Sequence, residues 1–131
     1  MPLPVFINPD TLLTPPGPYS HVARVGDLVF VSGQVGADRQ NVLVGPGIAA
    51  QAEQAIVNIR TALEAVGLGL DNIAKVTIFV PYPEDLGELV AHMDRTFPVH
   101  FPRGYPASSL VIVQRLVDPA LRIEIEAVAH A

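Results

Sequence analysis

The chain of 131 residues contains no cysteine and no tryptophan, and Lys75 is the single lysine among its eight basic residues. The absence of cysteine excludes disulfide bonds, thiolate metal ligands and a cysteine nucleophile, although it does not identify a cellular compartment. Charged residues are scarce, because they make up 16% of the chain, whereas soluble domains typically contain about 25%. Long hydrophobic runs are also missing, since no apolar stretch approaches the roughly 20 residues that span a bilayer.

Hydrophobic residues are abundant by contrast, and they make up 50% of the chain. A chain of this length suits one domain over residues 1–131 with a single core. Because the apolar content exceeds what such a core needs, we expect the excess to lie in subunit interfaces of a homo-oligomer.

The net charge of −5 and the scattered positions of the basic residues argue against a nucleic-acid partner. The first ten residues, MPLPVFINPD, have neither a basic segment nor an apolar segment of the kind that directs export. We therefore expect a cytoplasmic protein that does not associate with membranes.

Several kinds of active site can be set aside on spacing. The four histidines, His21, His92, His100 and His130, form no pair at metal-ligand spacing, so we expect no metal site. The G-P-G at residues 45–47 lacks the lysine and preceding strand of a phosphate-binding loop. No G-x-S-x-G motif occurs, and the sequence places no histidine beside Ser108 to activate it as a nucleophile.

The first half of the chain predicts a hairpin followed by a helix. Two β-like runs, residues 20–25 and 28–31, are separated by Gly26-Asp27, a typical hairpin turn. From residue 48 to residue 66 the apolar side chains recur at helical spacing, and Gly67 then supplies a stop.

The second half predicts three more strands and one more helix. Residues 71–80 alternate as a strand, and Pro83 begins a helix that Pro98 is expected to end at about residue 97. Its predicted buried positions are Leu86, Leu89, Val90, Met93 and Phe97. Two β-like runs, 109–113 and 121–128, complete the order β-β-α-β-α-β-β, which predicts an α+β fold with helices on one face of a mixed sheet.

Glu124 is the most informative polar residue. In LRIEIEAV, residues 121–128, the apolar side chains share one face of the strand, while Arg122, Glu124 and Glu126 share the other. One interpretation is a solvated strand face whose carboxylates pair with cations across the sheet. The other is a carboxylate on a rigid strand that orients or deprotonates a water molecule.

Five motifs occur in order and are spread over nearly the whole chain: GPYS at 17–20, GDLVFVSGQ at 26–34, QAEQAIVNI at 51–59, KVTIFV at 75–80 and IEIEAVA at 123–129. In this order and spacing they resemble the RidA (YjgF-like) family of reactive-intermediate deaminases. The resemblance implies a chorismate-mutase-like (YjgF-like) α+β fold, assembled as a homotrimer with ligand clefts between subunits. It also implies an enzyme that hydrolyses an imine or enamine to a carbonyl compound and ammonia without a metal or organic cofactor.

The resemblance also implies roles for individual residues. Glu124 matches the glutamate that positions the attacking water, and Tyr19 matches a tyrosine that lines the cleft. Ser32 and Gly33 match the segment that closes around the ligand; for Tyr19 and Ser32, packing in a turn and a bulge is an equally open interpretation. Asn58 matches a recurrent asparagine whose role we interpret as structural.

One departure from the family concerns the substrate. Deaminating members carry PARS with an arginine that grips the substrate carboxylate, whereas this chain has PASS with Ser108 in that place. An arginine offers a charged bidentate contact and a hydroxyl only one neutral hydrogen bond, so carboxylate binding is expected to weaken by tenfold or more. Arg103 is a candidate for the missing cation and Arg115 a weaker one, while Ser108 and Ser109 would form a polar wall.

Three functions stay open at this point. The first is a deaminase for a small imine or enamine other than the usual 2-imino acids. The second is a non-catalytic trimer of the same family that binds a small molecule. The third, a ribonuclease as in older descriptions of the family, fits poorly with an acidic chain.

Overall fold

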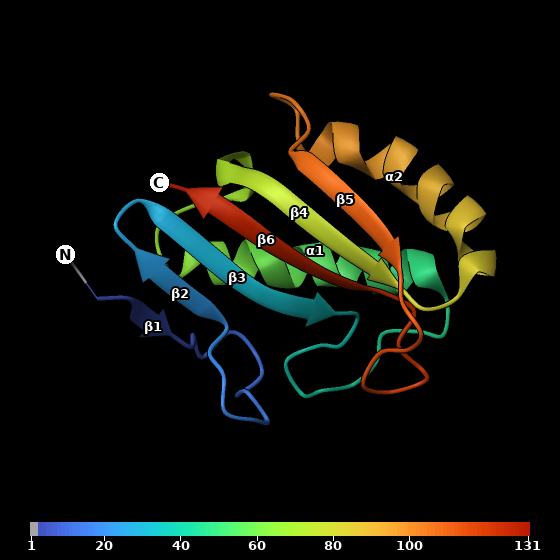
Figure 1. Cartoon of the computed structure of the whole chain (residues 1–131), viewed down its shortest axis with the longest axis horizontal. Coiled ribbons are helices and arrows are strands. Elements are labelled where there is room, and N and C mark those ends of the chain that lie inside the picture. The colour runs from blue at the N-terminus through green and yellow to red at the C-terminus, as the bar shows by residue number, and fades with distance from the viewer. Residues whose placement is uncertain (1–2) are drawn as a thin grey trace.

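A computed structural model describes residues 3–131 as a six-stranded mixed sheet with two α-helices on one face (Figure 1). The strands are β1 (Val5–Ile7), β2 (Val22–Val25), β3 (Leu28–Val35), β4 (Ile73–Val80), β5 (Ala107–Ile112) and β6 (Glu124–His130). The helices are α1 (Ile48–Glu64) and α2 (Leu86–His100), with short 3-10 turns η1 (Leu70–Asn72) and η2 (Pro83–Asp85) before β4 and α2. The predicted α+β sheet with both helices on one side is confirmed.

The strand order is β1-β2-β3-β6-β4-β5. Strands β4 and β5 pair in parallel because α2 crosses between them, and the other pairs are antiparallel. The predicted hairpin is present, with Val25 paired to Leu28 and Gly26 at a φ of 58° that favours glycine. Strand β1 was not predicted, because its three residues are too few to show a strand period.

Helix α1 begins where predicted and buries one continuous stripe against β3 and β6. Its apolar positions Ile48, Ala52, Ala55, Ile56, Ile59 and Leu63 all belong to the core. The chain leaves the helix after Glu64 through Gly67, whose φ of 76° is strained for other residues.

The predicted end of the second helix is wrong. Pro98 lies inside α2, which continues to His100, and the Phe101 amide still donates to the Phe97 carbonyl over 2.8 Å. Pro98 lacks only the bond that its N–H would have given to the Asp94 carbonyl, and Asp94 is exposed to water that can replace it. Burial of Val90 is also wrong in the single chain, since this side chain is 50% exposed while Leu89 is 1% exposed.

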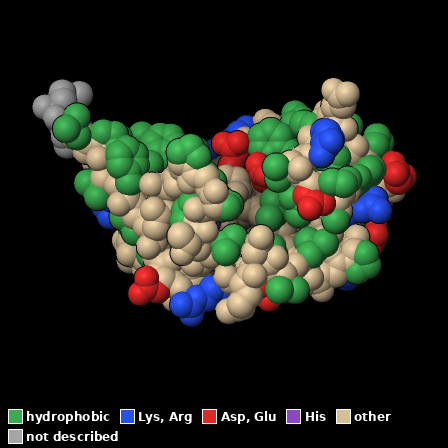
Figure 2. Space-filling view, turned by 90° about the horizontal axis from the view of Figure 1, so that it is seen from below, with side chains coloured by type: hydrophobic (Ala, Val, Ile, Leu, Met, Phe, Trp, Pro, Cys, Tyr) green, Lys and Arg blue, Asp and Glu red, His purple; other side chains and the backbone are tan. Residues whose placement is uncertain are grey.

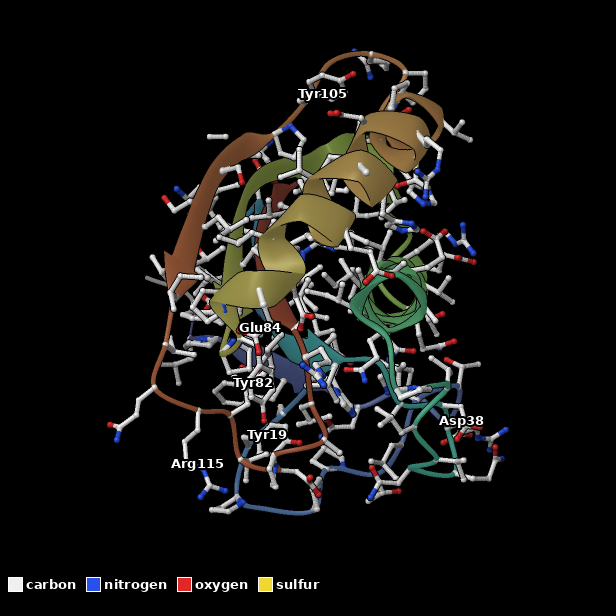
Figure 3. The ribbon with its side chains drawn as sticks, turned by 90° about the vertical axis from the view of Figure 1, so that its right-hand side faces the viewer. Tyr19, Asp38, Tyr82, Glu84, Tyr105 and Arg115 are labelled. Carbon is white, nitrogen blue, oxygen red and sulfur yellow. The ribbon has the colours of Figure 1, made fainter. Side chains whose placement is uncertain are left out.

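The face of the sheet opposite the helices is open in the single chain. Figure 3 shows both helices on the same side of the sheet. On the open side, strand alternation places apolar side chains such as Phe30, Phe79 and Val111 beside polar ones such as Lys75 and Thr77. Among residues 3–131, no helix is long and apolar enough to cross a membrane, and no cluster of three potential ligands could hold a metal ion.

Candidate functional site

A cavity of about 440 Å³ opens at the end of the sheet where β3 ends and β6 begins. Its walls come from the loop before β2, the end of β3 and the loop before β6. They include Leu13, Tyr19, Gly33, Val117, Leu121 and Glu124. Three residues that the sequence singled out, Tyr19, Gly33 and Glu124, therefore lie around one space.

Glu124 is the first residue of β6 and lies between Val35 of β3 and Phe79 of β4. Its neighbours Ile123 and Ile125 are buried under the helices, so strand alternation turns the half-buried Glu124 side chain to the opposite face. Gly33 lies directly against it, because a Cβ at position 33 would be 2.3 Å from Oε2 of Glu124. Cross-strand pairing with cations is not the arrangement found, since no ion pair among the described residues includes Glu124.

Partial burial raises the pKa of the Glu124 carboxyl above its usual range, and the negative charge of Glu126 raises it further. A carboxylate with a raised pKa is a stronger base than a fully solvated one. Burial also raises the pKa of the Tyr19 phenol, with the charge of Glu124 as the second cause. The phenol therefore stays protonated near neutral pH and can donate a hydrogen bond.

Ser32 precedes Gly33 in an irregular part of β3, where the register with β6 shifts between Val31 and Gln34. Its hydroxyl donates to the Ser20 carbonyl over 2.5 Å, and its amide donates to the His21 carbonyl over 2.9 Å. In this conformation Ser32 ties the bulge to the segment that carries Tyr19.

Buried amides on α1 hold the remaining walls in place. Asn58 donates to the carbonyls of Val35 and Ala37 over 3.1 and 2.9 Å, which fixes the chain where it leaves β3. Gln51 donates to the Ala120 carbonyl over 3.2 Å and accepts from the Arg122 amide over 2.8 Å, just before Glu124. Sequence reasoning missed Gln51, although a polar residue on the apolar stripe of a helix was a usable signal.

The two serines of PASS lie elsewhere in the same chain. Ser108 pairs with Val76 and Ser109 with Thr77, so the two side chains point to opposite faces of the sheet. Ser108 is exposed on the helix side of the edge strand β5, and Ser109 accepts a 2.7 Å hydrogen bond from the Lys75 ammonium.

The pairing of β5 with β4 and of β4 with β6 gives the separation between Ser108 and Glu124. Ser108 pairs with Val76, and Val76 pairs with Ala127, three residues beyond Glu124 on β6. The two residues are therefore roughly 10 Å apart along the strands and two strand spacings, about 9.5 Å, apart across the sheet. One chain by itself does not bring them into a single site.

The candidate cations differ in position. Arg103 lies beside Phe101 and Tyr105 in a separate hollow, and Figure 3 shows Tyr105 at the opposite end of the molecule from Tyr19. Arg115 lies at the same end as Tyr19 (Figure 3), and its guanidinium donates to the carbonyl of Val117, a residue of the cavity wall, over 3.3 Å. Within one chain, Arg115 is thus nearer to the cavity than Arg103.

The fold and this cavity define an α+β protein with a carboxylate and a phenol beside a glycine bulge. The family model described as Endoribonuclease L-PSP matches residues 10–131. The 2-iminobutanoate/2-iminopropanoate deaminase of Salmonella typhimurium is 36% identical over 113 residues, which cover 86% of this chain and 87% of the relative.

Solved structures agree with the sequence matches. The YjgF gene product of Escherichia coli has a TM-score of 0.87 at 32% identity and covers 96% of this chain and 98% of its own. Escherichia coli TdcF, solved with bound serine, has a TM-score of 0.87 at 28% identity and covers 97% of this chain and 98% of its own. The chain belongs to the RidA/YjgF/L-PSP family.

Proposed function

We propose that this protein hydrolyses a small reactive imine or enamine to a carbonyl compound and ammonia, in a homotrimer whose clefts lie between subunits. The observation that carries the proposal is the Glu124 carboxylate, half-buried against the Gly33 backbone at the wall of a cavity. The deaminase named among the relatives supports the reaction class.

The chemistry needs one water molecule and one base. The Glu124 carboxylate takes one proton from water as the water oxygen bonds to the imine carbon, and it passes that proton to the imine nitrogen, which gives a carbinolamine with one OH and one NH₂ group. The carboxylate then takes the hydroxyl proton and delivers it to the nitrogen as the C–N bond breaks, which leaves a carbonyl group and ammonia. The raised pKa of Glu124 suits both steps, because the carboxylate is a stronger base and its protonated form is more populated than in a fully solvated glutamate.

The proposed trimer is supported by the separation of Ser108 from Glu124 and by the exposed apolar side chains. Leu28, Phe30 and Val111 are 41%, 43% and 39% exposed on the open face. A neighbouring subunit that packs on this face would bury them and could bring its own β5 to the cavity. The basic side chains, in contrast, are scattered over the end of the molecule shown in Figure 2, which gives no support to binding of RNA.

We further propose that the substrate is not a typical 2-imino acid, because Ser108 offers no charge to a carboxylate. Ser109, Ser32, Gly33 and Tyr19 would contribute polar contacts from the assembled cleft. Arg103 would reach a ligand only from a neighbouring subunit.

The test is ammonia release from a panel of imines with and without a carboxylate. We expect turnover of at least one imine, loss of that turnover in Glu124→Gln, and little activity on 2-iminopropanoate. Rapid turnover of 2-iminopropanoate that persists in both Arg103→Ala and Arg115→Ala would contradict the proposed change of substrate. If no imine releases ammonia and Glu124→Gln changes the affinity for a ligand, the protein is the non-catalytic binding trimer instead.

Light scattering tests the assembly separately. At micromolar concentration we expect a particle of about three times the 14.0 kDa chain mass. A monomer at that concentration would contradict the inter-subunit cleft.

A further inference from the structure

His21 is a buried histidine whose two ring nitrogens both have partners. The residue is 5% exposed, with Nε2 2.6 Å from the Leu13 carbonyl and Nδ1 3.1 Å from Nε2 of Gln34. The same Gln34 nitrogen lies 3.1 Å from the Ser32 carbonyl, which orients the amide with its NH₂ toward His21. A carbonyl only accepts and an amide nitrogen only donates, so the imidazole carries its proton on Nε2 and is neutral.

These bonds connect three parts of the cavity wall. The Leu13 carbonyl belongs to the loop before β2, and the Tyr19 ring packs edge-on against the imidazole with centroids 6.1 Å apart. Through Gln34 the imidazole also reaches the Ser32 carbonyl, next to Gly33. His21 therefore links the tyrosine segment to the bulge that lies against Glu124.

The bulge depends on such links. The β3–β6 pairs are Val31 with Ala127 and Gln34 with Ile125, so Ser32 and Gly33 together face one residue, Glu126, of the partner strand. Regular ladder pairing is interrupted at a bulge of this kind. The bonds from His21, Gln34 and Ser32 replace it.

We infer that His21 is a positioning residue of the Glu124 cavity and that it holds the Ser32–Gly33 bulge only as the neutral imidazole. Its consequence for turnover rests on the proposed deaminase function, whereas its consequence for the bulge does not. His21 does not touch the reacting atoms; it acts through Gln34 and the bulge on Gly33 and Glu124.

A second proton on His21 breaks this arrangement whichever way Gln34 turns. With the amide as found, the new Nδ1–H would point at the NH₂ group of Gln34, and two donors would face each other. If the amide rotates so that its oxygen accepts from Nδ1–H, its nitrogen leaves the Ser32 carbonyl and an oxygen takes its place. One of the two bonds is lost in either case, and the bulge loses a support.

The titratable or charged groups around His21 come from several elements. Tyr19 packs on the ring, and Asp38 and Arg39, from the loop after β3, line the same small pocket as His21. Glu124 lies beyond Gly33 in the adjoining cavity, which shares Tyr19 with that pocket. Because Glu124 also titrates, the pH profile of the wild type alone does not isolate His21.

The test compares the wild type with His21→Gln and His21→Leu. Glutamine supplies an NH₂ donor group and a carbonyl acceptor but does not titrate, while leucine supplies neither. The matched control is His130→Gln, at the exposed end of β6. For each protein, kcat/KM is measured with the best imine of the panel from about pH 8 to pH 5, the range in which histidines commonly titrate. The hydrogen-exchange protection factor of the Ser32 amide is measured over the same range.

We expect protection of the Ser32 amide to fall about tenfold in the wild type and in His130→Gln on acidification, a change of about 1.4 kcal/mol. It should stay constant in His21→Gln and be low throughout in His21→Leu. The wild-type kcat/KM should fall more steeply with acid than that of His21→Gln. Equal losses of protection in wild type and His21→Gln, or constant wild-type protection, would overturn the inference, even if His21→Leu fails to fold. Absence of ammonia from every imine would remove the proposed function while the exchange data still decide the role of His21.

Discussion

Gly33 and Glu124 lie so close that no side chain fits between them, since a Cβ at position 33 would be 2.3 Å from Oε2 and 2.7 Å from Cδ of Glu124. Strand β6 fixes the backbone of Glu124, so the carboxylate itself would have to move away from such a Cβ. The absence of a side chain at position 33 therefore determines where the Glu124 carboxylate can lie.

Gly33→Ala is therefore expected to lower kcat by at least about tenfold while the protein stays folded. The carboxylate can swing into the open cavity, so the clash costs position more than stability. Steady-state kinetics with circular dichroism measure both. The control is Gly87→Ala, in helix α2, where a Cβ meets nothing within 4 Å; it should stabilise the helix by about 1 kcal/mol without changing kcat. Full activity of Gly33→Ala would show that the carboxylate position is not critical.

Glu124→Gln should stabilise the protein above acidic pH. The pKa of Glu124 is raised on folding, first by burial and then by Glu126, so the folded state binds its proton more tightly than the unfolded state. Stability therefore falls as pH rises from the ordinary glutamate range, about 4.3, through the raised pKa, and the ionised carboxylate is least favourable above it. The urea midpoint of unfolding should be higher for Glu124→Gln than for the wild type at pH 8. The two midpoints should become equal at low pH.

Glu126→Gln provides the companion measurement for that titration. The negative charge of Glu126 is the smaller of the two causes that raise the pKa of Glu124. Removing that charge should therefore lower the pKa of Glu124 only in part. Carboxyl chemical shifts followed through a pH titration report this directly. A shift of Glu124 that vanished in Glu126→Gln would mean that burial is not the main cause.

Ser108→Arg should restore part of the activity on 2-imino acids. Ser108 is exposed on β5, so the larger side chain requires no change in the core. A charged contact in place of a neutral one is expected to raise kcat/KM on 2-iminobutanoate about tenfold or more. The control is Ala91→Arg, at an exposed position of helix α2 on the other side of the sheet from the open face. Equal gains in both variants would indicate a general charge effect.

Glu53 should matter for stability and not for chemistry. Its two carboxylate oxygens lie 3.2 Å from Nε2 of His92 and 2.8 Å from Nε2 of His100, which joins α1 to α2 on the helix side of the sheet, opposite to the side that carries the Glu124 side chain. The two imidazoles are 13% and 11% exposed, so Glu53→Ala leaves them poorly hydrated and is expected to cost about 2 kcal/mol of unfolding free energy. Glu64→Ala, whose carboxylate is 62% exposed beside Arg60, should change little. A loss of kcat in Glu53→Ala at unchanged stability would contradict this assignment.

The strands and helices were predictable where the local spacing of apolar residues matches the side chains that are buried in the fold. Helix α1 and the hairpin at Gly26 follow from side-chain period and turn residues, which depend on near neighbours in the sequence. Pro98 did not end α2, and the carbonyl that loses its hydrogen bond belongs to Asp94, whose exposure to water no local pattern reports. The same limit hid β1, which is a strand only because β2 offers it an edge.

The sequence by itself determined the fold class, the family and the alternation that turns Glu124 away from the helices, because periodicity and motif order are properties of the chain. The tertiary structure alone decided which of the candidate site residues lie close together. It brought Tyr19, Gly33 and Glu124 to one cavity, linked His21 to Gln34 behind them, and left Ser108 on the other face of the sheet. Strand order and register are set by packing between distant segments, and one register step exchanges the two faces of a strand.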